Sequence, residues 1–209
     1  SKIHREVEIL EKDNFKIIMI GHKFHPEVIG TIGQAKNKEN IILVEDVKDV
    51  EALDFKKNQK IAYVTQTTLS VYDTSSIVKA IKEKFPDVTE PKKSDICYAT
   101  SNRQLSVQEL AKKVEAFYVI GANNSSNSVR LVETAKLFGS PHALLVQNID
   151  DFDFQALKHY KNIGLTASAS APEELIRKFV SKLEENFSIT INDQKIPENV
   201  KFKVPNFLN

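Results

Sequence analysis

The chain has 209 residues, of which 41% are hydrophobic and 27% are charged, and its formal net charge is +1. This composition is typical of a folded globular protein of one or two domains and excludes a disordered chain. The sequence has neither an apolar run of about 18 residues nor the apolar core of a signal peptide, so we expect a cytoplasmic protein with no membrane segment. Mixed charges of both signs give no basis for binding nucleic acid.

Six short apolar runs predict the strands of the fold. They are continuous rather than alternating, as in strands that are buried on both faces. They lie at residues 15–20, 41–44, 61–64, 117–120, 143–146 and 163–165. Amphipathic stretches such as 74–84 and 107–114 lie between them and predict helices. The alternation of strands and helices indicates parallel α/β layers.

An internal repeat divides the chain. Residues 15–21 recur as 116–121, 42–49 recur as 144–151, and 60–65 recur as 162–166, a period of about 100 residues. We therefore expect two repeated parallel α/β units. The predicted boundaries are 1–93 for the first unit and 94–187 for the second, followed by an irregular C-terminal tail at 188–209.

Polar residues gather directly after four of the predicted strands, in segments 21–27, 65–70, 121–128 and 166–173. Ligands of parallel α/β proteins bind at this edge, where helix N-termini present free N–H groups. Helix capping alone is the simpler explanation for any one loop. However, the run from Ser125 to Ser128 is denser than one cap requires, which favours a phosphate or diphosphate site.

Two other groups could contribute chemistry. His25 could donate to a ligand oxygen and Glu27 could relay a proton, or the two could simply form an ordinary helix start. His22 is a weaker candidate, and the surroundings of the other histidines indicate no site. Cys97 is the single cysteine. It could be a small buried apolar residue, a nucleophile or a metal ligand, although a cysteine-only metal site needs more thiolates than one chain supplies.

Five motifs in order resemble the 4-hydroxy-3-methylbut-2-enyl diphosphate reductase family. They are Gly21-His22 with His25-Pro26-Glu27, Thr65-Gln66-Thr67-Thr68-Leu69-Ser70, Asp95-Ile96-Cys97-Tyr98-Ala99-Thr100, Asn124-Ser125-Ser126-Asn127-Ser128, and Ala169-Ser170-Ala171-Pro172-Glu173. The resemblance implies three α/β units with pseudo-threefold symmetry around a central 4Fe–4S cluster. It also implies reductive dehydroxylation of an allylic diphosphate to isopentenyl and dimethylallyl diphosphates in the non-mevalonate pathway, with ferredoxin or flavodoxin as electron donor.

The resemblance also implies roles for individual residues. Glu27 would be the proton donor and Cys97 one of three cluster ligands. The substrate-binding residues would be His25, Thr67 and Thr68 near the hydroxyl end, and Ser125, Ser126, Asn127 and Ser170 at the diphosphate.

The chain departs from the family at its start, because the unit that carries two further cysteines and two substrate-binding histidines would precede Ser1. We therefore expect that this chain alone binds no stable cluster and is inactive. Two alternatives remain open. The chain could be a non-catalytic phosphate-binding module, or an interaction subunit completed by a separately encoded N-terminal chain.

Overall fold

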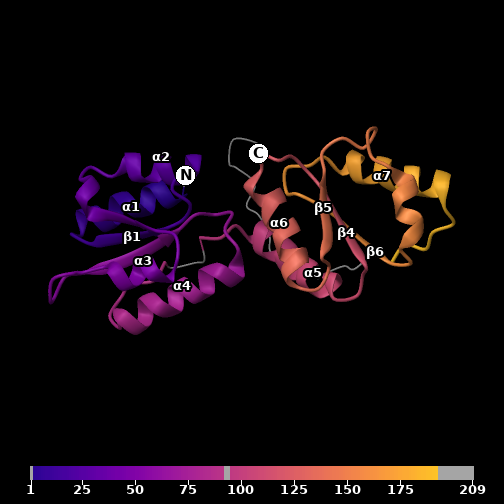
Figure 1. Ribbon diagram of the computed structural model, residues 1–209. Helices are drawn as coiled ribbons and strands as arrows, with labels where there is room; N and C mark the ends of the chain where they lie inside the picture. The colour runs from indigo at the N-terminus through magenta and orange to yellow at the C-terminus, as the bar shows by residue number, and fades with distance from the viewer. Residues whose placement is uncertain (1, 92–94, 193–209) are drawn as a thin grey trace.

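The computed structural model describes residues 2–91 and 95–192 and contains two α/β units that lie side by side (Figure 1). The first is built from α1 (Lys2–Lys12), β1 (Lys16–Ile20), α2 (Pro26–Gln34), η1 (Lys38–Asn40), β2 (Ile41–Val44), α3 (Val47–Ala52), β3 (Ile61–Thr65) and α4 (Val71–Lys84). The second is built from α5 (Tyr98–Ala111), β4 (Ala116–Ile120), α6 (Ser126–Leu137), β5 (His142–Val146), η2 (Phe154–His159), β6 (Ile163–Ala167) and α7 (Glu173–Asn186).

Each unit has a three-stranded parallel sheet, and the strand orders are the same. The orders are β2-β1-β3 and β5-β4-β6, so the first strand of each unit lies in the centre. Ile18 pairs with Ile42 and Tyr63, and Tyr118 pairs with Leu144 and Leu165 in the second sheet. The predicted α/β class and its repeat are therefore confirmed, and each predicted strand is found within two residues of its expected bounds.

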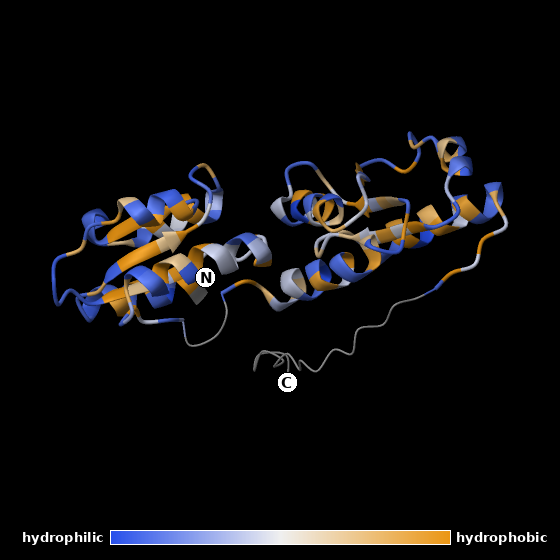
Figure 2. Ribbon diagram, turned by 60° about the horizontal axis from the view of Figure 1, so that its bottom comes forward, coloured by the Kyte–Doolittle hydropathy of each residue, from blue (hydrophilic) through white to orange (hydrophobic). Residues whose placement is uncertain are grey.

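Helices cover both faces of each sheet, as the continuous apolar strands require. In the first unit, α1 and α2 pack on the face that carries Ile17 and Met19, while α3 and α4 pack on the opposite face. In the second unit, α5 and α6 cover the face of Phe117 and Val119, and η2 and α7 cover the other. Figure 2 shows mostly hydrophobic residues in the strands and alternating hydrophobic and hydrophilic residues along the helices that flank them.

Helix α5 differs most from its prediction. The periodic stretch 107–114 predicted only its second half, whereas the helix begins at Tyr98 and ends at Ala111. Its first half carries polar residues on buried positions, including Thr100 and Gln104, so it lacks the one-sided apolar stripe by which a helix is recognised.

The predicted division of the chain is only partly covered by the described residues. The boundary between residues 93 and 94 lies outside them. So do residues 193–209 of the predicted C-terminal tail.

Candidate functional site

The carboxyl ends of the central strands β1 and β4 lead into equivalent tight turns. The Gly21 amide donates to Val44 O and the Gly121 amide donates to Val146 O, both at 3.1 Å. The helix that follows each glycine lies against it. A Cβ on Gly21 would be 2.5 Å from Val28 Cγ2, and a Cβ on Gly121 would be 2.9 Å from Ser128 Cβ and would also clash with Ser128 Oγ. Glycine at these positions therefore brings the first turns of α2 and α6 close to the sheets.

Gly121→Ala is expected to destabilise the chain, because the added methyl group would meet Ser128 Cβ, which the first turn of α6 holds in place. A loss of about 1–3 kcal/mol in unfolding free energy is expected from overpacking of this kind. Urea denaturation measures it. Gly33→Ala is the matched control, since nothing lies within 4 Å of the place that its methyl group would take in α2; it should be neutral or stabilising by up to about 1 kcal/mol. Equal effects of the two changes would contradict the close-approach argument.

Glu27, Thr67 and Cys97 form one connected group. Glu27 Oε2 accepts hydrogen bonds from the Thr67 amide at 3.1 Å and from Thr67 Oγ1 at 3.0 Å. The Cys97 amide donates to Thr67 O at 3.0 Å. Cys97 is the N-cap residue of α5, but its side chain makes no capping bond and is exposed. The prediction that Cys97 is a small buried apolar residue is therefore wrong. Its backbone amide binds the carbonyl of Thr67, whose hydroxyl group in turn binds the carboxylate of Glu27.

His25 links the two units. Its Nδ1 accepts from the Glu27 amide at 3.2 Å, which caps α2, and its Nε2 lies 2.7 Å from Ser126 Oγ. Because Nδ1 is an acceptor, the neutral ring carries its proton on Nε2 and donates it to Ser126. Two of the predicted substrate-binding side chains, from sequence positions 101 residues apart, therefore meet.

Asn127 is the polar side chain with the most unusual surroundings in this group. It is 6% exposed, yet neither its Oδ1 nor its Nδ2 has a hydrogen-bond partner among the described residues, and the adjacent Ser128 Oγ is in the same condition. A buried amide without partners costs roughly 1–3 kcal/mol per unsatisfied group, so natural proteins rarely retain one without a use. The start of α6 thus presents both donor and acceptor capacity beside Ser126.

The loops after β3 and β6 repeat one side-chain arrangement. Gln66 Nε2 donates to Thr68 Oγ1 at 3.0 Å, and in the second unit Ser168 Oγ lies 3.3 Å from Ser170 Oγ. Thr68 and Ser170 are therefore equivalent positions. Ser170 is exposed, and its hydroxyl group is within hydrogen-bond distance of Ser168 Oγ.

His22 and Arg130 make a second contact between the units. Arg130 Nη2 donates to His22 Nε2, and Arg130 Nη1 pairs with Glu133 Oε2 at 2.5 Å. His22 Nδ1 lies 3.9 Å from Glu45 Oε1. The sequence did not identify Arg130, because it lies one turn inside α6 and outside every polar loop. Its contact with His22 depends on how the two units pack against each other.

This contact predicts a pH dependence of stability. Burial, followed by the charge of Arg130, lowers the pKa of His22 below its ordinary 6.5, against the opposing charge of Glu45. The unfolded chain then binds the proton more readily than the folded chain, so the contribution of His22 is complete above about pH 6.5 and is lost as pH falls toward the lower folded pKa.

His22→Gln should therefore reduce the loss of stability between about pH 7.5 and 5.5, since glutamine accepts from Arg130 but does not titrate. The urea midpoint at the two pH values measures this. His159→Gln, on the exposed end of η2, serves as the control. An unchanged pH dependence in His22→Gln would argue against the contact.

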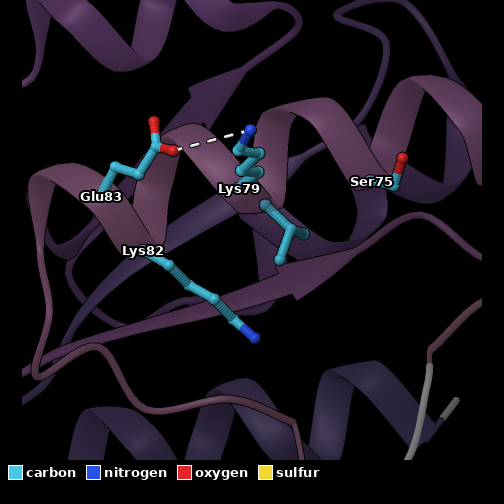
Figure 3. A pocket seen from close by; sticks show the side chains of 5 residues that line it. Ser75, Lys79, Lys82 and Glu83 are labelled. Atoms are coloured by element: carbon cyan, nitrogen blue, oxygen red, sulfur yellow. Dashed lines mark ion pairs between the residues drawn. The ribbon is translucent and has the colours of Figure 1, made fainter.

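A hollow of about 410 Å³ lies away from these loops, on α4 (Figure 3). Ser75, Val78, Lys79, Lys82 and Glu83 line it, and Lys79 pairs with Glu83 at 3.8 Å. It is an open surface of one helix, and none of the predicted site residues lines it.

Within residues 2–91 and 95–192, no cluster of three or more His, Cys, Asp or Glu side chains is arranged to hold a metal ion. No helix in these ranges has the length and apolarity needed to cross a bilayer.

These features define a repeated parallel α/β protein with a polar candidate site where its units meet, rich in hydroxyl and amide groups. Residues 1–184 match the family model described as LytB protein, and the chain belongs to this family.

The chain is similar to proteins named 4-hydroxy-3-methylbut-2-enyl diphosphate reductase. It is 45% identical to the protein of Cereibacter sphaeroides (strain ATCC 17029) over 209 residues, which are 100% of this chain and 65% of that protein. The Vesicomyosocius okutanii protein is 44% identical over 98% of this chain and 67% of its own length. Among solved structures, the E-1-hydroxy-2-methyl-but-2-enyl-4-diphosphate reductase of Plasmodium falciparum superposes with a TM-score of 0.88 at 40% identity, covering 99% of this chain and 65% of that one. The chain thus spans about 65% of the length of the first relatives that it matches.

Proposed function

We propose that this chain supplies the diphosphate-holding and proton-donating part of a 4-hydroxy-3-methylbut-2-enyl diphosphate reductase. In the proposed reaction the allylic C–O bond of the substrate breaks, and two electrons and two protons are consumed. One proton leaves with the hydroxyl group as water, and the other goes to carbon to give isopentenyl or dimethylallyl diphosphate. The names of the relatives support this substrate.

The observation that carries the proposal is Asn127, a buried amide whose donor and acceptor atoms are both without partners among the described residues. A diphosphate oxygen would accept from its Nδ2 and from Ser126, whose Oγ already lies 2.7 Å from His25 Nε2. Ser125, the N-cap of α6, and Ser170 would complete the set of donors. Hydroxyl and amide donors at a helix N-terminus are suited to bind a diphosphate because the helix dipole favours its charge.

Glu27 is the proposed proton donor. Its bond to Thr67 Oγ1 at 3.0 Å, together with the bond from its own amide to His25 Nδ1, gives it a fixed place at the hydroxyl end of the proposed site. Because Thr67 donates twice to Oε2, Glu27 would carry the transferable proton on Oε1 and Thr67 would orient the carboxyl group. Thr68, held by Gln66, would contact the substrate near its hydroxyl group. On substrate binding, His25 Nε2, which donates to Ser126 Oγ here, would donate to a substrate oxygen instead and orient the substrate between the two units.

The thiolates of this chain do not suffice for an iron–sulfur cluster. A cubane cluster requires three or four thiolates, and the chain contains one cysteine. The residues of this chain therefore do not fit a complete cluster. Cys97, exposed and free of capping bonds, is suited to be one ligand of a cluster whose other thiolates come from elsewhere. We assign to the other site residues substrate holding and proton transfer only.

The remaining parts of the proposal concern the setting of the enzyme. We assign it to the cytoplasm with a ferredoxin or flavodoxin as the electron donor, as expected of a reductase in isoprenoid synthesis. We also propose that residues 1–93 and 94–187 act as two units of the complete enzyme, one contributing Glu27 and the other Cys97.

The test is to fuse this chain to the first third of the C. sphaeroides relative, the part that the family resemblance places before Ser1. We call this fusion the completed enzyme. After anaerobic cluster assembly and with a chemical reductant, it should convert 4-hydroxy-3-methylbut-2-enyl diphosphate to the two product diphosphates, detected by mass spectrometry. Cluster assembly without any conversion would contradict the proposed function.

A further inference from the structure

The start of α5 is joined to the loop after β3 by a ladder of hydrogen bonds that runs from one unit to the other. The Thr65 amide donates to Asp95 Oδ2 at 3.1 Å, and the Cys97 amide donates to Thr67 O at 3.0 Å. Asp95 is 5% exposed, so the first bond lies inside the protein.

Gln104 completes the ladder two turns along α5. Its Nε2 donates to Leu69 O at 2.8 Å and its Oε1 accepts from the Val71 amide at 2.9 Å. The side chain is 1% exposed, and both ends of its amide are used. The two partners fix the orientation of the amide, because a carbonyl requires the NH₂ and an N–H requires the oxygen. Gln104 thus holds the loop just beyond Thr67 and the first residue of α4 at a set distance from α5.

We propose that Gln104 is a positioning residue that sets where Cys97 lies relative to Thr67 and Glu27. The proposal deepens the proposed function and rests on it for its catalytic consequence. Cys97 makes no side-chain capping bond, so α5 does not fix its own first turn by the usual means. The buried side-chain amide of Gln104 fixes α5 instead, through its hydrogen bonds to Leu69 and Val71 in the segment that follows Thr67.

The two hydrogen bonds of the Gln104 side chain, which we call the Gln104 clamp, have a chemical consequence. Thr67 is bound on one side to Glu27 Oε2 and on the other to the Cys97 amide. A shift of the Thr67 loop against α5 would therefore move Thr67 and Glu27 relative to the Cys97 amide, and none of these hydrogen bonds involves Ser126, Asn127 or Ser128 at the start of α6. Loss of Gln104 should impair the chemical step and leave the binding of the diphosphate largely intact.

Amide hydrogen exchange on this chain tests the clamp. Gln104→Met keeps the shape of the side chain and removes both hydrogen bonds. The amides of Thr67 and Cys97, which Gln104 does not touch, should exchange about tenfold faster, while those of Phe117 and Val119 in β4 keep their rates. Gln108→Met, one turn further along α5, should change none of them. Unchanged exchange at Thr67 and Cys97, or equal acceleration in β4, would overturn the proposal.

The completed enzyme provides the second readout. Gln104→Met should lower kcat at least about tenfold while KM for the diphosphate substrate stays within about twofold, as expected when a group is misplaced rather than a ligand lost. An unchanged kcat would overturn the positioning role. If the unsubstituted completed enzyme makes no product, the proposed function fails, and hydrogen exchange still decides whether the clamp exists.

Discussion

Glu27→Gln in the completed enzyme should lower kcat by about 100-fold to 10,000-fold, the range attributed to general acid catalysis. Glutamine has nearly the same shape as glutamate and retains an oxygen that can accept from the Thr67 amide, now 3.1 Å from Glu27 Oε2. It cannot release a proton at neutral pH. The arrangement of the site should therefore persist, and the loss should appear in kcat rather than in KM.

Steady-state kinetics with the allylic diphosphate measure this effect, and circular dichroism checks the fold. Glu51→Gln, an exposed change of the same chemistry in α3, should leave both constants unchanged. A wild-type kcat in Glu27→Gln would show that another group delivers the proton. A rise in KM alone would instead give Glu27 a binding role.

Asn127→Leu should weaken binding of the diphosphate substrate while it raises the stability of the folded chain. Leucine is close to asparagine in size and removes the two buried polar atoms that have no partner among the described residues. The free energy of unfolding should therefore rise by about 1 kcal/mol, because a desolvation cost disappears. In the completed enzyme the same change should raise KM for the diphosphate about 10-fold to 100-fold, the value of a hydrogen bond to a charged group.

Asn124→Leu, at an exposed position of the same loop, is the matched control. It should change neither the free energy of unfolding nor KM for the diphosphate. Urea denaturation of this chain and substrate saturation of the completed enzyme give the two quantities. Destabilisation by Asn127→Leu with an unchanged KM would mean that Asn127 is a structural residue, which contradicts its proposed contact with the diphosphate.

Much of the fold was predictable because the strands carry an unambiguous signal. A run such as Phe117–Val119 is apolar throughout, since helices cover both faces of its sheet. The repeat added a second, independent indication, and the two sheets indeed share one strand order. The first half of α5 was not predicted, because Thr100 and Gln104 are buried polar residues that the hydrophobic pattern does not encode.

The candidate site was predicted as a set of residue types and loop positions, but its connections were not. That Glu27 would bind Thr67, or that His25 would reach Ser126, depends on how the elements pack in three dimensions. The same is true of Arg130, which no motif contains. The unsatisfied condition of Asn127 could be recognised only once its burial and lack of partners were known.

Binding of a diphosphate at the start of α6 can be followed by a nuclear magnetic resonance titration of this chain with inorganic diphosphate. The amides of Ser126, Asn127 and Ser128 should shift most, with a smaller shift at Ser170. The hollow on α4 (Figure 3) is the comparison region, because its Lys79 and Lys82 are paired with Glu83 and Glu90 and should not respond. Shifts confined to Lys79 and Lys82, with none at the start of α6, would contradict diphosphate binding by Ser126 and Asn127.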